Sequence, residues 1–424
     1  MRRLLALVAC AAAAAACDGG CLGGYGSAPV QGNSGVFTVA TVGTTQKLFL
    51  PMADALPNGN AWLAVVDPEV AGNGAAGAPA QRSAIDLGCP GSPSTVGADG
   101  TWAVAASTLD RNVWIIDAAS EELITRVVLD DSFGVSGFSG GGGYVTGVAV
   151  DGAHRQAILA VWNGFALMEL PSGKITGVIE APPSENFGFD AFRGRVIAPF
   201  YECATAALNG APPAFCGDYE ADGLNVIDLT TEAVFRYRDT SARDPKSPVG
   251  GEPDSATVDL SSGTAVVSSE LGGFESVIEL GQASFSTTAN TAGTLTATRH
   301  EVSGLGFTGI AIPPDGSRAF FEEEFSPDVA VVGLSAALQG NARARIGLLP
   351  DAPGAVPWEN AGDPHGIGAM ALGGKPFGLV VNRQRSWIAR VDLTKMEALP
   401  ANGGIIQTAD MASAVTFLDP RTPP

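Results

Sequence analysis

The chain has 424 residues, 46% of them hydrophobic, so it is long enough and apolar enough to build a large buried core. It carries 44 acidic residues against 24 lysines and arginines, which gives a formal net charge of −20. A strongly acidic surface repels phosphate backbones and anionic lipid headgroups, which argues against nucleic acid as a partner and against direct binding to a membrane surface.

The N-terminus has the pattern of a secretory leader. Arg2 and Arg3 precede an unbroken apolar run from Leu4 to Ala16. That run is too short to span a bilayer, which needs about 20 apolar residues, but it has the length of a signal-peptide core. We therefore expect residues 1–16 to be a signal peptide. Residues 17–35, rich in glycine and polar groups, are expected to form a flexible tether.

Two cysteines near the leader compete as the site of a lipid anchor. The leader resembles that of bacterial lipoproteins, in which cleavage occurs directly before a cysteine that is then acylated. Cys10 follows residues that resemble the usual motif more closely, but it leaves too short an apolar core, whereas Cys17 is correctly placed after the alanine run. We predict lipidation at Cys17, with ordinary secretion as the alternative. The protein is then expected in the bacterial cell envelope, on the periplasmic or cell-surface side, with the lipid as its membrane attachment.

The other cysteines, Cys21, Cys89, Cys203 and Cys216, are even in number, as expected for disulfides in an exported chain. Cys203 and Cys216 lie in a Pro- and Ala-rich insertion at about 201–221, and we expect their disulfide to close it. Cys21 with Cys89 is then the default second pair. A metal site made of these cysteines is disfavoured, because the sequence has no CxxC motif and its three histidines are scattered.

The body of the chain, residues 36–424, repeats one pattern of short strands separated by turn residues. The clearest copy, 144–179, reads as four strands with turns at Asp151-Gly152 and Ser172-Gly173. Four short antiparallel strands per copy are typical of a β-propeller blade, and a solenoid is the main alternative. Further copies are recognisable at 96–129, 186–238, 253–280, 307–334 and 364–399.

The two ends of this region, 47–69 and 411–420, each hold less than a full copy. Pairing N- and C-terminal strands within one blade removes an open sheet edge, so we expect the two ends to share a blade. The sequence therefore predicts an all-β fold, a single β-propeller domain. Its expected form is seven blades of four-stranded antiparallel sheets, with the ring closed by pairing of the N- and C-terminal strands.

Several copies resemble the repeat of YVTN-type, WD40-like bacterial β-propellers. The stretches "GIAIPPDGSRAFF", "NVWIIDAASEELITRVVL" and "GLNVIDLTTEAVFRYR" carry the resemblance. Asn163 and Asn382 match the asparagine that closes the second strand of that repeat, whereas Glu270 and Glu323 replace it in two copies. The resemblance implies a propeller fold. For function it implies only a broad choice, since such propellers include binding proteins, surface proteins and relatives of lactonases.

In a propeller, the starts of first strands and the ends of second strands meet at one rim of the central channel. Carboxylate and amide oxygens at such a rim suit Ca²⁺, for which Asp254 and Glu270 are the candidates. The alternative is that strand ends simply collect turn-forming residues. Aligning the copies places Thr146, Asn186, Asp254, Thr308 and His365 at the starts, and Asn163, Glu202, Glu270, Glu323 and Asn382 at the ends.

The rim residues favour a role as a ligand-binding or protein-interaction scaffold, whose partner is an envelope protein or a small ligand. The alternative is a Ca²⁺-dependent hydrolase of the lactonase type that uses the central channel. In that case His365, with Asp363 as its partner carboxylate, is the candidate general base, although such a histidine more often bonds a backbone carbonyl. We assign no catalytic residue, expect no cofactor besides Ca²⁺, and expect a monomer.

Overall fold

A computed structural model shows how the predicted strands are arranged. The predicted signal peptide and tether lie outside the residues that the structure describes. The described residues are 38–42, 45–52, 55–66, 81–91, 93–107, 110–133, 145–161, 164–181, 184, 187–200, 223–238, 253–259, 262–269, 274–279, 297–301, 307–313, 315–323, 328–334, 344–347, 364–372, 375–382, 387–394, 397–398 and 405–407.

The described strands form seven antiparallel sheets, each built from strands that are consecutive in the chain. Sheet 1 contains β1 (Thr38–Val42), β2 (Thr45–Pro51), β3 (Trp62–Val66) and β4 (Gln81–Asp86); sheet 2, β5 (Thr95–Ala98), β6 (Trp102–Ala106), β7 (Asn112–Asp117) and β8 (Glu122–Val128); sheet 3, β9 (Val145–Asp151), β10 (Gln156–Val161), β11 (Gly164–Glu169) and β12 (Ile175–Glu180). Sheet 4 contains β13 (Gly188–Asp190), β14 (Arg195–Phe200), β15 (Gly223–Asp228) and β16 (Ala233–Arg238); sheet 5, β17 (Pro253–Asp259), β18 (Thr264–Ser269), β19 (Phe274–Glu279) and β20 (Ala297–Glu301). Sheet 6 contains β21 (Phe307–Ala311), β22 (Arg318–Glu323), β23 (Asp328–Gly333) and β24 (Ala344–Gly347); sheet 7, β25 (Pro364–Leu372), β26 (Lys375–Asn382), β27 (Trp387–Asp392), β28 (Glu397–Ala398) and β29 (Ile405–Gln407).

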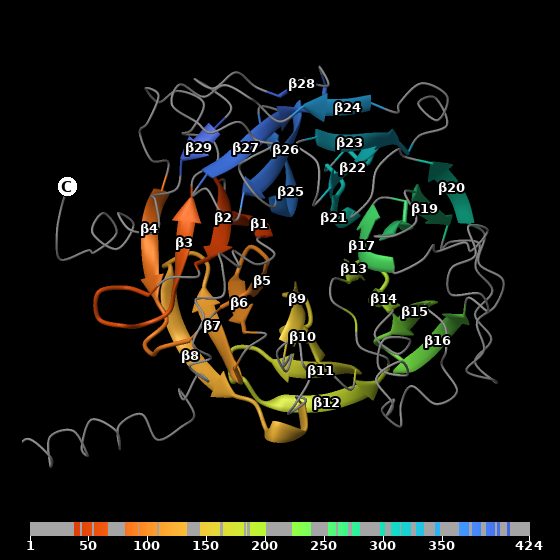
Figure 1. Ribbon diagram of the computed structural model, residues 1–424. Coiled ribbons are helices and arrows are strands. Elements are labelled where there is room, and N and C mark those ends of the chain that lie inside the picture. The colour runs from red at the N-terminus through yellow and green to blue at the C-terminus, as the bar shows by residue number, and fades with distance from the viewer. Residues whose placement is uncertain are drawn as a thin grey trace, which may run out of the picture.

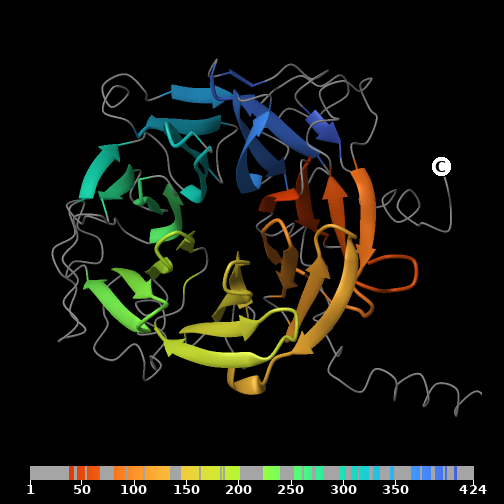
Figure 2. The same cartoon turned by 180° about the vertical axis from the view of Figure 1, so that it is seen from behind.

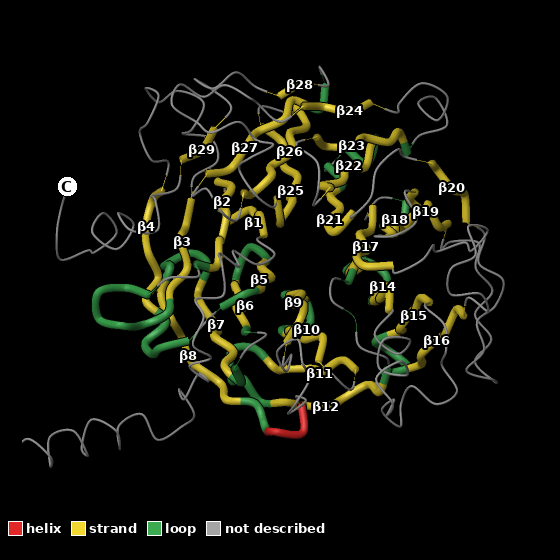
Figure 3. The backbone as a smooth tube through the Cα atoms, in the orientation of Figure 1, coloured by secondary structure: helices red, strands yellow, loops and turns green. Residues whose placement is uncertain are grey.

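The sheets stand around a common centre in the order of the sequence (Figure 1). The first strand of each sheet lies innermost and later strands lie further out, as the view from behind also shows (Figure 2). One helical turn is described, η2 (Asp131–Phe133), and it lies at the outside of the ring (Figure 3). Among the described residues, no helix is long and apolar enough to cross a membrane.

The burial patterns explain why the strands take these places. The second strands β6, β10 and β14 are buried along almost their whole length, because neighbouring sheets cover both of their faces. The fourth strand β12 instead alternates between exposed and less exposed residues, which is typical of a strand at the outer edge. The sequence encodes this difference as continuous apolar runs inside and mixed runs outside.

The core is divided into clusters that each join two adjacent sheets. Leu63 of β3 and Trp114 of β7 belong to one cluster, and Val104 of β6 and Leu159 of β10 belong to another. The innermost strands approach each other most closely. At Gly97 of β5, an added Cβ would lie 2.5 Å from the Val148 carbonyl oxygen of β9. Glycine is therefore required there for the first strands to pack around the centre.

The expected sharing of one sheet between the two chain ends is wrong for the part of the chain that the structure describes. All four strands of sheet 1 come from 38–86, and all strands of sheet 7 come from 364–407. The sequence pattern missed β1 and β4, because "TVATV" and "QRSAID" lack the long apolar runs of the inner strands. Sheets 1 and 7 meet by packing of β1 against β25. The segment 411–420, expected to supply the shared strand, lies outside the described residues.

Candidate functional site

The two sides of the ring are built from different connections. We call the side that carries the links between first and second strands the turn face, and the opposite side the loop face. The links from first to second strands are short, at 43–44, 99–101, 152–155, 191–194, 260–263, 312–317 and 373–374, while the links from third to fourth strands on the same face include the long stretches 67–80 and 280–296. The links from a fourth strand to the next first strand begin and end at the loop face, at 87–94, 129–144, 181–187, 239–252, 302–306 and 348–363.

Three turns on the turn face, in sheets 3, 4 and 5, share one pattern of hydrogen bonds. Each of the three begins with an aspartate, and the residue three positions later binds that aspartate through both its backbone N–H and its side chain. In sheet 3, the His154 N–H donates to Asp151 Oδ1 at 3.2 Å, and its Nδ1 lies 2.7 Å from Oδ2. In sheet 4, the Arg193 N–H donates to Asp190 Oδ1 at 3.2 Å and its Nη1 donates to Oδ2 at 3.0 Å.

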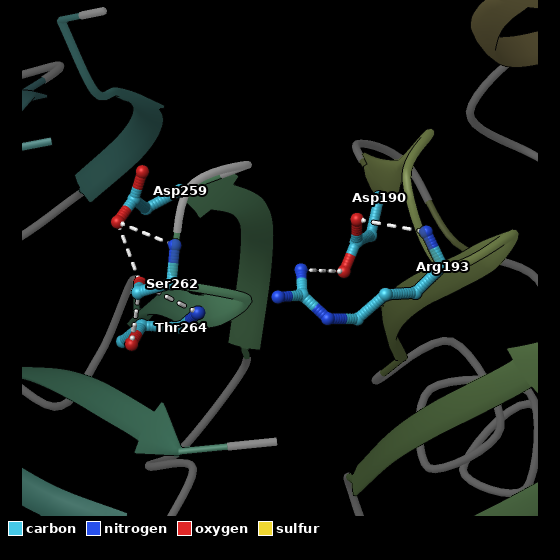
Figure 4. Close-up of polar contacts among 5 residues, drawn as sticks. All are labelled: Asp190, Arg193, Asp259, Ser262 and Thr264. Carbon is cyan, nitrogen blue, oxygen red and sulfur yellow. Dashed lines mark hydrogen bonds and ion pairs between the residues drawn. The ribbon is translucent and has the colours of Figure 1, made fainter. Parts of the chain in front are cut away.

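Sheet 5 uses a serine in the same position. Ser262 donates to Asp259 Oδ2 through its backbone N–H at 3.2 Å and through its hydroxyl at 2.5 Å, and Ser262 Oγ lies 2.9 Å from Thr264 Oγ1 (Figure 4). The three capping aspartates are almost fully buried, whereas the bonded side chains reach the surface to different extents. These three turns therefore combine a buried aspartate with a donor three residues later, and the donor can be histidine, arginine or serine.

Neighbouring turns also contact each other across the sheet boundaries. An added Cβ at Gly263 would lie 2.7 Å from the Arg193 guanidinium carbon, and one at Gly316 would lie 2.9 Å from Asp259 Oδ1. Figure 4 shows Arg193 extending from its own turn toward the turn that holds Ser262. Side chains of one turn thus fill the space that glycine leaves open in the next.

A buried ion pair joins sheets 1 and 2 near the turn face. The Lys47 ammonium lies 2.7 Å from Glu121 Oε1 and donates to the carbonyls of Ala118 and Ala119 at 2.9 and 3.2 Å. Asp117 begins the same turn. The N–H of Ser120, helped by the Ala119 N–H and the Lys47 charge and opposed by partial burial, holds the pKa of the Asp117 carboxyl below its ordinary value.

No family model matches the sequence, and no curated protein matches it either. Solved structures do match the fold. Hydrazine synthase from Kuenenia stuttgartiensis aligns with a TM-score of 0.52 at 11% identity, covering 91% of this chain and 99% of that one. The β-propeller domain of Cps50 (Swd1) from Myceliophteria thermophila aligns with a TM-score of 0.51 at 11% identity, covering 85% of this chain and 94% of that one.

The chain is a β-propeller. The prediction of an all-β propeller is therefore confirmed. At 11% identity the likeness extends to the fold alone, because propellers of one architecture carry many unrelated functions.

The backbone pairing places several predicted rim positions at the loop face. Pro253, Phe307 and Pro364, the first residues of β17, β21 and β25, pair with Ser269, Glu323 and Asn382, the last residues of the second strands. Asp254, Thr308 and His365 are the second residues of those first strands. Their side chains are not described, so binding by Asp254, Glu323, His365 and Asn382 stays a prediction.

The other rim positions divide into two groups. Asn163, Asn186, Glu202 and Glu270 lie outside the described residues, so the Ca²⁺ pair of Asp254 and Glu270 is not tested. Thr146 is described, and its hydroxyl donates to the Ser184 carbonyl at 2.5 Å, which ties β9 to the link that follows β12. Within the described residues, no group of three or more His, Cys, Asp or Glu side chains is placed to hold a metal ion.

Of the cysteines, Cys89 is described, and it is a buried free thiol in the core between sheets 1 and 2. Because Cys21 lies outside the described residues, the expected disulfide between Cys21 and Cys89 stays a prediction. The apolar surroundings of Cys89 explain its burial without a covalent partner, since a free cysteine packs as a small hydrophobic residue. Cys17, Cys21, Cys203 and Cys216 lie outside the described residues, and the lipid site and the Cys203–Cys216 bridge stay predictions.

The hydrogen bonds between a turn aspartate and the residue three positions later were not predicted from the sequence. The sequence pattern identified the turn at Asp151-Gly152 but did not connect Asp151 with His154, or Asp190 with Arg193. The signal was present as an aspartate followed three residues later by a donor, in "DGAH", "DAFR" and "DLSS". The spacing is detectable only when the copies are aligned on their turns and not on their strands.

Proposed function

We propose that the protein is an exported, lipid-anchored propeller of the YVTN type, whose seven sheets act as the blades of one ring. In this proposal it is a ligand-binding or protein-interaction scaffold in the bacterial cell envelope. The leader and Cys17 support the location, and the repeat motifs in the first, second and third strands support the propeller type.

The observation that carries the binding role is the difference between the two faces. The inner turns on the turn face are short and satisfy their own hydrogen bonds. On the loop face, the long links 129–144, 239–252 and 348–363 each lead to an innermost strand, and the insertion 201–222 joins β14 to β15, whereas the long links of the turn face, 67–80 and 280–296, join outer strands. Long connections on a rigid scaffold are where binding residues concentrate. We therefore assign the binding role to the loop face.

Cross-linking in intact envelopes tests this assignment. One variant replaces residues 204–215 of the insertion with a Gly-Ser linker, which leaves Cys203 and Cys216 in place. The matched control replaces residues 284–293, in the link between β19 and β20 on the turn face, with the same linker. We expect partners captured by the wild-type protein to be lost from the first variant and kept by the second. Equal capture by all three proteins would contradict the assignment.

The anchor is tested separately by mass spectrometry of the mature N-terminus. We expect a diacylglyceryl group on Cys17 and loss of the protein from the membrane fraction in Cys17→Ser, with no change in Cys10→Ser. An unmodified N-terminus, or lipid on Cys10, would contradict the proposed anchor. Because a released protein keeps its loop face, this result does not depend on the cross-linking result.

A further inference from the structure

A buried amide lies at the boundary between sheets 3 and 4, which we call the 3–4 boundary. Asn225, the third residue of β15, is 0% exposed, and neither its nitrogen nor its oxygen has a hydrogen-bond partner in the part of the chain that the structure describes. Leu224 and Val226 belong to the core between sheets 4 and 5, whereas Ile227 belongs to the core of the 3–4 boundary. Because side chains alternate along a strand, the Asn225 side chain lies on the face of β15 that turns toward sheet 3.

The core of the 3–4 boundary is apolar. Ala198, which pairs with Asn225 on β14, belongs to the same cluster as Ile227. Sheet 3 contributes Phe165, whose ring meets that of Phe187 edge to face with the ring centroids 5.3 Å apart. Apolar side chains cannot bond an amide, so closing this boundary removes both polar atoms of Asn225 from water without replacement. Buried groups of this kind raise the free energy of the closed state.

The link 181–187, which joins sheet 3 to sheet 4, holds a second polar group of this kind. Ser184 is 2% exposed, and its hydroxyl has no hydrogen-bond partner among the described residues. The Ser184 carbonyl accepts the Thr146 hydroxyl at 2.5 Å, so β9 holds the link through its backbone and not through the Ser184 side chain. Unpartnered polar groups are therefore buried both on β15 and on the link that crosses this boundary.

The strands of sheets 3 and 4 also approach each other less closely than those of the other neighbouring sheets. β5 packs on β1 and β9, β17 packs on β13 and β21, and β25 packs on β21 and β1. Among the described residues, no strand of sheet 3 packs to the same extent on a strand of sheet 4. An added Cβ at Gly177 of β12 would still lie 3.9 Å from Glu232 Oε1 of sheet 4. Low contact density and unbonded buried polar groups both favour local opening.

We propose that the 3–4 boundary opens locally while the rest of the ring stays folded. In the closed state apolar side chains fill it, and in the open state water bonds the Asn225 amide and the Ser184 hydroxyl. Hydration of these groups partly offsets the apolar burial that opening removes. In β7 of sheet 2, the third residue is the buried Trp114, whose ring lies against Gly91 of the link 87–94. The 3–4 boundary has the shorter and more polar Asn225 at that place.

The boundary between sheets 1 and 2 shows why a buried amide alone is not sufficient. Asn112 of β7 is also 0% exposed, and its amide atoms have no partner in the described part of the chain. That boundary is held closed by the Lys47–Glu121 ion pair and by packing of β1 and β2 on β5. We therefore expect opening at the 3–4 boundary and not at this one.

Opening of the 3–4 boundary changes the shape of the loop face. The insertion 201–222 leaves β14 after Phe200 and enters β15 at Gly223, two residues before Asn225. Both of its ends belong to sheet 4, so they move relative to sheet 3 when the boundary opens. The opening itself goes beyond the scaffold role. A regulatory effect of the opening on partner binding rests on the binding role proposed for the loop face.

Cysteine labelling of the purified protein without a partner tests the opening. Ala198→Cys places a thiol at the 3–4 boundary, whereas Ala106→Cys and Ala265→Cys place thiols at the boundaries between sheets 2 and 3 and between sheets 4 and 5; all three alanines are 0% exposed. Iodoacetamide modification at each position, followed by peptide mass spectrometry, reports the population of the open state. We expect Ala198→Cys to be labelled at least about tenfold faster than the other two.

Asn225→Leu, combined with Ala198→Cys, tests the cause of the opening. It removes the amide and keeps most of the volume, so it should slow labelling at position 198 at least about tenfold. Asn112→Leu is the matched control, because it removes an equally buried amide from another boundary, and it should leave this rate unchanged. Val196→Cys, in the same core, serves as the reporter if Ala198→Cys does not fold, and Asn225→Val replaces Asn225→Leu on the same ground.

Several outcomes would overturn the proposal. These are equal labelling of the three reporters, a rate at position 198 that Asn225→Leu leaves unchanged, and equal slowing by Asn112→Leu. Labelling at position 198 that rises with urea as steeply as global unfolding would also overturn it, because a local opening exposes less surface. The protein carries no partner in this experiment, so its result does not depend on the cross-linking test of the loop face.

Discussion

Replacing Lys47 with methionine removes the positive charge of the buried ion pair between sheets 1 and 2 and keeps most of the side-chain volume. The Lys47 and Glu121 side chains are only 4% and 12% exposed, and their charged atoms lie 2.7 Å apart. Removing one partner of such a pair leaves an uncompensated buried charge, which costs about 3–5 kcal/mol. This is a large share of the 5–15 kcal/mol that typically stabilises a folded domain.

The same substitution removes the ammonium group that donates to the carbonyls of Ala118 and Ala119. Buried acceptors without a donor are costly, so these carbonyls add to the loss. We expect Lys47→Met to lower the free energy of unfolding by at least about 3 kcal/mol. Urea unfolding followed by tryptophan fluorescence measures this loss, since Trp62 and Trp114 are buried in sheets 1 and 2.

Two further variants make the result decisive. Lys174→Met removes an exposed lysine from a turn of sheet 3 and should change the free energy of unfolding by no more than about 0.5 kcal/mol. Combining Lys47→Met with Glu121→Gln removes both charges, and it should recover part of the loss because no unpaired charge remains. A loss below about 1 kcal/mol for Lys47→Met is the size expected of a solvated surface pair, and it would refute the reasoning.

Three other predictions concern glycine packing, a buried amide and acid stability. Gly97→Ala places a Cβ 2.5 Å from the Val148 carbonyl oxygen and should lower the free energy of unfolding by about 1–3 kcal/mol. Gly177→Ala meets no atom nearer than 3.9 Å and should leave the melting temperature almost unchanged. Equal losses of melting temperature in the two variants would contradict the packing argument. Asn225→Leu replaces a fully buried amide whose nitrogen and oxygen lack partners among the described residues, so the melting temperature should hold or rise, and a clear fall would show that the amide is bonded. Asp117 has a lowered pKa in the folded state, so its stabilising contribution is complete above its unfolded pKa of about 3.9 and is lost as the pH falls through the lower folded value. In urea titrations, the deficit of Asp117→Asn relative to wild type should therefore be larger at pH 7 than at pH 3, and an equal deficit at both would count against this assignment.

The sequence predicted the repeating part of the fold well, for a physical reason. Inner strands such as β6 and β10 are buried along almost their whole length, so their sequences are nearly continuous apolar runs between turn residues. Outer and terminal strands have no such requirement. β1 and β4 were missed because neither contains a long apolar run, and that miss led to the wrong expectation of a sheet shared by the chain ends.

Contacts between sheets could not be predicted from the sequence, because they join residues far apart in the chain. Lys47 lies in 47–69, which the sequence pattern identified only as less than a full copy of the repeat. Nothing in that stretch indicates that Glu121 is the partner of Lys47. The contact of Arg193 with Gly263 is similar, since an exposed-looking arginine and a turn glycine become neighbours only when two sheets stand side by side. The burial of Cys89 in the core between sheets 1 and 2 is a further example, because the count of cysteines gives no information about which core a cysteine joins.

The boundary between sheets 1 and 7 has a mechanical consequence. Every other pair of adjacent sheets is joined by a continuous stretch of polypeptide, whereas among the described residues sheets 1 and 7 are joined only by the packing of β1 against β25. If the chain is anchored through its N-terminus, a force on a bound partner passes to the membrane through β1, the first strand of the ring. The anchor would then pull directly on the boundary between sheets 1 and 7. Under load, the propeller should therefore open at this boundary before any single sheet unfolds.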